Sequence, residues 1–129
     1  MGPEGKEVFL DYRGRGVTAE EILKKFSPPS YFCASIDGGA VPDKAALMSA
    51  LAAAFRFPAY FGKNWDALLD CLRSLPNELP ARGYVLLIGN SSAFLAGRPR
   101  DLEDFADVAA EAKAFLADKF KADLSIILI

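Results

Sequence analysis

The stretch Phe57–Leu75, FPAYFGKNWDALLDCLRSL, combines a loop with an amphipathic helix, and the expectations for the rest of the chain follow from it. Gly62 is typical of a tight loop with positive φ, and Asn64 is a residue type that caps helix N-termini. Asp66 and Asp70 are four residues apart, which places both carboxylates on one helix face. Because like charges at this spacing destabilise a helix by about 0.2–0.5 kcal/mol, the pair needs an explanation beyond helix formation.

The opposite face of this predicted helix is apolar, so we expect it to pack against a core. Its members are Trp65, Leu68, Cys71, Leu72 and Leu75. Arg73 continues the acidic stripe by one turn, and the aromatic residues Tyr60 and Phe61 precede the helix. Aromatic residues beside paired carboxylates suit the binding of a cationic pocket. The same pattern also fits a solvated helix face, and spacing alone favours that simpler interpretation.

Three short apolar runs rich in strand formers lie on either side of this stretch: Tyr31–Ile36, Tyr84–Ile88 and Leu124–Ile129. Helical patterns alternate with them, including one helix capped by Asp43 and a long one capped by Asp101. Strands that alternate with helices predict an α/β fold with a small three-stranded parallel sheet and right-handed crossovers.

Residues 1–30 form an N-terminal extension to this predicted domain of residues 31–129. Glu7–Tyr12 is a possible strand, and Thr18 with Glu21 makes a capping box at the start of a short helix that ends before two prolines. The sequence leaves open whether this segment is an additional βα unit or a surface arm.

The size and charge of the chain limit its function. With 129 residues, 52% of them hydrophobic and 25% charged, it is long enough for one compact domain. Its 15 basic and 17 acidic residues give a net charge of −2, which does not favour direct nucleic-acid binding. No apolar run is long enough to span a membrane, and no signal peptide is recognisable. We therefore expect a cytoplasmic protein that is monomeric when free.

The absence of histidine removes the commonest catalytic acid–base group and the commonest metal ligand. Cys33 and Cys71 are expected to be reduced core residues. Asp70 and Cys71 do not make a base and nucleophile pair, because adjacent helical residues point about 100° apart. The sequence therefore predicts no cofactor, no metal and no enzymatic activity.

The segment Tyr60–Leu72, YFGKNWDALLDCL, closely resembles the second-helix signature of the barstar family, whose members are intracellular inhibitors of the secreted bacterial ribonuclease barnase. The likeness extends from about Tyr31 to the C-terminus and includes the closing segment Asp123–Leu128, DLSIIL. This resemblance implies a barstar-like fold and a bacterial immunity protein of a toxin–antitoxin pair. Its implied partner is a basic ribonuclease.

The resemblance also implies roles for individual residues. Asp70 would occupy the place of the substrate phosphate in the ribonuclease, Asp66 would supply a second charge, and Tyr60 would pack against the enzyme. The other candidate contact residues are Phe61, Gly62, Asn64, Leu69, Arg73 and Asp118. Leu69 stands where the family prototype has a tryptophan. The family's last-helix glutamate falls on Leu116, and Asp118 is the nearest acid that could substitute for it.

The sequence therefore leaves two functions open. The first is a barstar-like inhibitor that blocks the cationic active site of a ribonuclease with an acidic helix face. The alternative is a regulatory interaction module with the same fold, no inhibitory activity and a different cytoplasmic partner.

Overall fold

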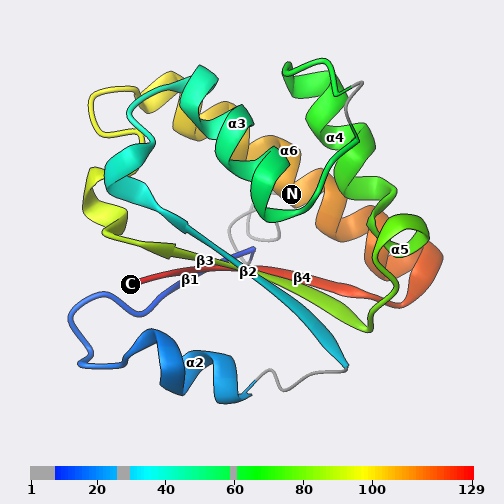
Figure 1. Cartoon of the computed structure of the whole chain (residues 1–129), viewed down its shortest axis with the longest axis horizontal. Coiled ribbons are helices and arrows are strands. Elements are labelled where there is room, and N and C mark those ends of the chain that lie inside the picture. Colours follow the sequence, from blue (N-terminus) through cyan, green and yellow to red (C-terminus); the bar gives the residue numbers. More distant parts are fainter. Residues whose placement is uncertain (1–7, 26–29, 59–60) are drawn as a thin grey trace.

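The computed structural model describes residues 8–25, 30–58 and 61–129 as one sheet covered by helices on both faces (Figure 1). Helices α3, α4 and α6 lie above the sheet in this view, and α2 lies below it. The elements in chain order are β1 (Phe9–Asp11), α2 (Ala19–Lys25), β2 (Tyr31–Asp37), η1 (Gly38–Ala40), α3 (Lys44–Ala54), α4 (Trp65–Arg73), α5 (Leu75–Glu78), β3 (Gly83–Gly89), η2 (Ser91–Ala93), α6 (Pro99–Phe120) and β4 (Asp123–Leu128).

The sheet has four parallel strands in the order β1-β4-β3-β2. The predicted parallel α/β architecture is confirmed, but the prediction of three strands is wrong. The additional strand is β1, which pairs Phe9 with Ile126 and is held to β4 by a bond of 2.7 Å from the Ile126 N–H to the Val8 carbonyl. With only three residues, β1 has too little alternation to identify its partner, and its pairing joins opposite ends of the chain.

Strand β3 lies between two neighbours and is buried from Gly83 to Ile88. Tyr84, Leu86 and Ile88 belong to the main core cluster under α3, α4 and α6, whereas Val85 and Leu87 belong to a second cluster with α2. This alternation follows from the two-residue period of a strand. The continuous apolar run therefore reflects burial on both faces, as parallel sheets require.

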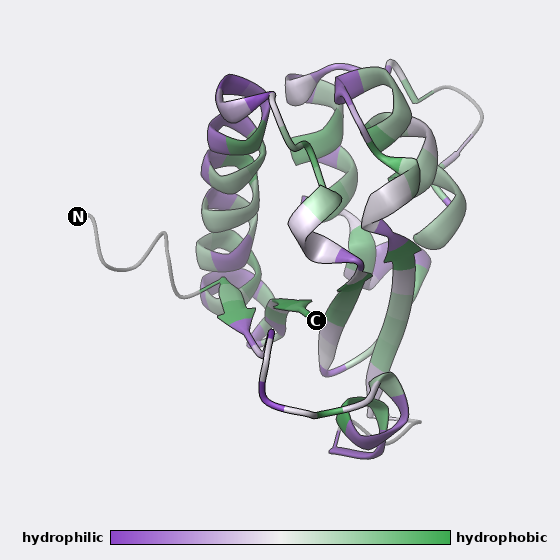
Figure 2. Ribbon diagram, turned by 90° about the vertical axis from the view of Figure 1, so that its left-hand side faces the viewer, coloured by the Kyte–Doolittle hydropathy of each residue, from purple (hydrophilic) through white to green (hydrophobic). Residues whose placement is uncertain are grey.

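The helices above the sheet contribute several of the largest residues of the main core, including Leu47, Leu51, Leu68, Leu72, Phe105 and Leu116. Helix α3 is capped as predicted, because Asp43 Oδ1 accepts a bond of 2.9 Å from the Ala46 N–H. Helix α6 differs from its prediction: it begins with Pro99 at the first helical position rather than after Asp101. In Figure 2 the strands are mostly hydrophobic, whereas α6 alternates between hydrophilic and hydrophobic bands.

Helix α2 covers the second face of the sheet. The predicted capping box is present, since the Thr18 N–H donates to Glu21 Oε1 at 2.9 Å and the Glu21 N–H donates to Thr18 Oγ1 at 3.2 Å. Ile22 is fully buried in the second core cluster beside Ile127. Within the described residues, the N-terminal segment therefore forms a βα unit that is part of the sheet and its covering layer.

Replacing Ile22 with alanine should lower the free energy of unfolding by about 2–5 kcal/mol, the usual cost of an Ile-to-Ala cavity in a core. Urea denaturation followed by circular dichroism measures this loss. Glu20→Ala, at an exposed position on the same helix, is the matched control and should change stability little. Equal stabilities for the two variants would show that α2 is not packed on the sheet.

Candidate protein-binding site

Helix α4 carries the predicted acidic stripe, and its cap and core contacts fix the orientation of that stripe. Asn64 Oδ1 accepts a bond of 2.8 Å from the Ala67 N–H, which confirms Asn64 as the N-cap. Leu68 and Leu72 are buried, so the residues on the other side of the helix face outward. Asp66 and Asp70 are both exposed. Within the described part of the chain, neither carboxylate has an ion pair or a side-chain hydrogen bond.

The chain turns directly after α4 into the short helix α5. The Ser74 N–H donates to the Asp70 carbonyl at 3.1 Å and so closes α4. Leu75, predicted to lie on the apolar face of α4, is buried at the start of α5 instead. This turn places Glu78, which is exposed, near the C-terminal end of the acidic stripe.

Arg73 connects the acidic stripe to α6. Its Nη2 lies 2.9 Å from Glu111 Oε2, and its guanidinium carbon lies 5.1 Å from the centre of the Phe115 ring. Glu111 keeps an exposed side chain and thus adds a carboxylate beside α4. Sequence reasoning missed Glu111, because only the packing of α6 on α4 brings it there.

The structure bears on the last-helix acid that the resemblance implies. Leu116, where the family's glutamate falls without gaps, is fully buried and has no access to a partner. Asp118 is exposed on α6. It lies two helical turns beyond Glu111, or about 10 Å along the axis. Two exposed acids of α6 are therefore available to extend the acidic stripe of α4.

The remaining candidates differ in their exposure. Phe61 is only 9% exposed and its ring centre lies 5.1 Å from that of Phe57, so it supports the loop from within the core. Gly62 is exposed, but the positive φ falls on the next residue, Lys63, at 56°. Leu69 is half-buried against the main core. Tyr60 lies outside the described residues.

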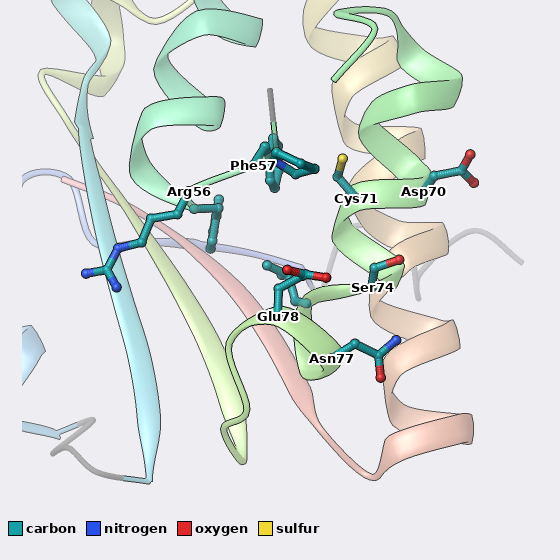
Figure 3. A pocket seen from close by; sticks show the side chains of 10 residues that line it. Arg56, Phe57, Asp70, Cys71, Ser74, Asn77 and Glu78 are labelled. Atoms are coloured by element: carbon teal, nitrogen blue, oxygen red, sulfur yellow. The ribbon is translucent and has the colours of Figure 1, made fainter. Parts of the chain in front are cut away.

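A cavity of about 160 Å³ lies beside the C-terminal half of α4 (Figure 3). Its lining comes from the end of α3 and the following loop, from α4 and from α5: Phe55, Arg56, Phe57, Pro58, Asp70, Cys71, Ser74, Leu75, Asn77 and Glu78. Cys71 is free and half-buried in this wall. Burial raises the pKa of the Cys71 thiol, and the negative charges of Asp70 and Glu78 raise it further.

The described ranges hold neither a candidate metal site nor a candidate membrane-spanning helix. No group of three or more histidine, cysteine, aspartate or glutamate side chains there could hold a metal ion. Among the same residues, no helix combines the length and apolar character that crossing a membrane requires. The exposed acidic face formed by α4 with Glu111 is the principal candidate site.

A sequence model of the family described as Barstar (barnase inhibitor) matches residues 31–125. The chain belongs to the barstar family. The match runs from β2 into β4 and includes the whole of α4, whereas β1 and α2 precede it. No curated protein sequence matches the chain. At the level of the family, membership points to a barnase-inhibitor-like function rather than to enzymatic activity.

Replacing the helix cap should test how firmly the acidic stripe is anchored. Asn64→Ala removes the bond to the Ala67 N–H, and we expect it to lower the free energy of unfolding by about 1 kcal/mol. Asn64→Asp retains a capping oxygen and should lose much less. Chemical denaturation of the two variants beside the wild type measures both values. A loss of the same size in both would exclude capping as the role of Asn64.

Proposed function

We propose that this barstar-family chain inhibits a ribonuclease by placing Asp70 in its cationic active site. The observation that carries the proposal is an exposed carboxylate with no internal partner among the described residues, on a helix fixed by buried leucines and by Ser74 at its end. Asp70 is too far from the start of α4 for the helix dipole to account for it. Its exposure therefore suits a partner that supplies the missing positive charge.

The chemistry of a ribonuclease site makes this arrangement effective. Such a site must bind the phosphate of its substrate with cationic side chains, and a carboxylate forms the same charge-assisted hydrogen bonds without offering a bond to cleave. Because α4 is already folded and capped, little conformational entropy is lost when Asp70 enters the site. The chain would thus block the active site with a carboxylate held on a rigid helix.

The neighbouring residues would complete the contact. Asp66 supplies a second charge one turn away, and Leu69 offers a half-buried apolar surface between the two aspartates. Asn64 Nδ2 donates to the Gly62 carbonyl at 3.5 Å, which joins the loop to the start of the helix. Tyr60, as the packing aromatic residue, stays a prediction from the resemblance. Acidic residues around the contact would mainly steer association with a basic enzyme and make its rate depend on salt.

The same proposal places the chain in the cytoplasm, monomeric when free and without a catalytic role of its own. A bacterial cell that makes a basic secreted ribonuclease would need such an immunity protein. The alternative is a regulatory module that uses the acidic face for a different cytoplasmic partner.

Inhibition of a panel of guanyl-specific ribonucleases by the wild-type chain provides the test. We expect at least one enzyme to be inhibited, with association slowing as salt rises. Asp70→Asn should weaken inhibition by about a hundredfold, since it leaves cationic groups of the enzyme unpaired. The control Glu20→Gln removes an exposed acid on α2, across the sheet from α4, and should inhibit like the wild type.

The outcomes separate the two functions. If no ribonuclease in the panel is inhibited, the inhibitor proposal fails and the regulatory alternative takes its place. If inhibition survives in Asp70→Asn at full strength, the acidic face of α4 is not the contact.

The α6 acids can be distinguished in the same assay. Glu111→Gln should weaken inhibition by about two- to fivefold, because it removes a peripheral acid and leaves the positive charge of Arg73 uncompensated beside Asp70. Asp118→Asn tests a second exposed acid of α6, one that has no ion pair with a described residue, and we expect a smaller effect. A larger loss in Asp118→Asn than in Glu111→Gln would reverse this assignment.

A further inference from the structure

The cavity beside α4 has an apolar floor and a polar rim. The rings of Phe55 and Phe57 are stacked with their centres 6.0 Å apart, and Leu75 is buried next to them. Ser74 and Glu78 supply polar groups to the lining, and in Figure 3 the Glu78 carboxylate points toward Ser74. A space with such a lining suits a side chain that has both an apolar stem and a polar end.

The charges around the cavity are those of carboxylates. Among the described residues of the lining, Arg56 alone is basic, and its guanidinium carbon lies 5.6 Å from the centre of the Phe32 ring. Figure 3 shows this guanidinium pointing away from the other lining residues. Asp70 and Glu78 remain, and both are close enough to the Cys71 thiol to disfavour its negative charge. Within the described residues, neither carboxylate has an internal cation.

The volume and the lining favour one kind of occupant. A cavity of about 150 Å³ is large enough for a benzene molecule, so this one can accept a single long side chain. Arginine has a stem that can lie on Phe57 and Leu75, a planar group that stacks on aromatic rings, and five donors for carboxylates. A carboxylate at the rim would gain a charge-assisted bond from it.

We propose that this cavity receives an arginine side chain of the inhibited ribonuclease, with its guanidinium paired to Glu78. The inference rests on the proposed function and extends it to the choice of enzyme. Asp70 would recognise the phosphate-binding groups that ribonucleases share, whereas the cavity selects enzymes that carry an arginine close to those groups. Glu78 is thus a specificity-determining contact residue.

The test uses a ribonuclease that the wild-type chain inhibits. Glu78→Gln should weaken binding by about tenfold, mainly through faster dissociation, because one charged hydrogen bond is lost in a partly enclosed site. Glu20→Gln on α2 is the matched control and should bind like the wild type. A double-mutant cycle combines Glu78→Gln with alanine replacement of each arginine and lysine near the enzyme's active site. We expect one arginine to show coupling with Glu78.

A second measurement follows Cys71, which lines the cavity. The variant Cys33→Ala leaves Cys71 as the remaining thiol, and its rate of alkylation by iodoacetamide reports access to the cavity. We expect alkylation to slow strongly in the complex. In a complex with the enzyme variant that lacks the coupled arginine, the rate should recover in part.

Each result supports or overturns the inference. If Asp70→Asn loses affinity while Glu78→Gln does not, the cavity proposal fails and the inhibitor proposal stands. Coupling of Glu78 to a lysine alone would contradict the choice of arginine. Unchanged alkylation of Cys71 in the complex would show that the cavity stays empty. If no ribonuclease is bound, both proposals fail together.

Discussion

The burial of Leu68 and Leu72 is the constraint on which the site depends. A helix has a fixed angular relation between its positions, so the two leucines that pack on the core leave Asp66 and Asp70 no orientation except outward. The Asn64 cap and the Ser74 terminus fix where this helix begins and ends. The repulsion between the two aspartates is small beside the free energy of burying the apolar face, and the fold can therefore hold a pair of charges that an isolated helix would disfavour.

The sheet beneath this helix is stable because both of its faces are covered. Strand β3 is buried on both sides, and its alternating side chains are divided between a large cluster under α3, α4 and α6 and a small one against α2. Without Ile22 and its neighbours on α2, Val85, Leu87 and Ile127 would lie at the surface. The N-terminal segment outside the family match thus completes the sandwich, while the matched segment carries the acidic face.

The acidic face and the adjacent cavity differ in what they can recognise. Carboxylates on a rigid, exposed helix respond to any strongly cationic site, and they act over distances of about 10 Å at moderate salt. A cavity with an aromatic floor acts only on contact and depends on the shape of the group that enters it. Asp70 and Cys71 both line the cavity, so in the proposed complex long-range attraction and short-range selection would act on a single surface. Arg73 limits the net charge of this surface through its bond to Glu111.

The sequence by itself determined the elements whose signals are local. The caps at Asn64, Asp43 and Thr18, the apolar runs of β2, β3 and β4, and the outward side of α4 follow from side-chain chemistry within a few residues. Only the tertiary structure decided the features that join distant segments. In the sheet, these are the pairing of β1 with β4 and the packing of α2 on the second face. At the candidate site, they are the ion pair of Glu111 with Arg73 and the cavity between α3, α4 and α5. A periodic pattern predicts which side of a helix or strand is buried, but which other element packs on that side depends on the fold of the whole chain. For that reason the outward position of Asp70 could be predicted from the sequence, whereas the positions of Glu78 and Glu111 near α4 could not.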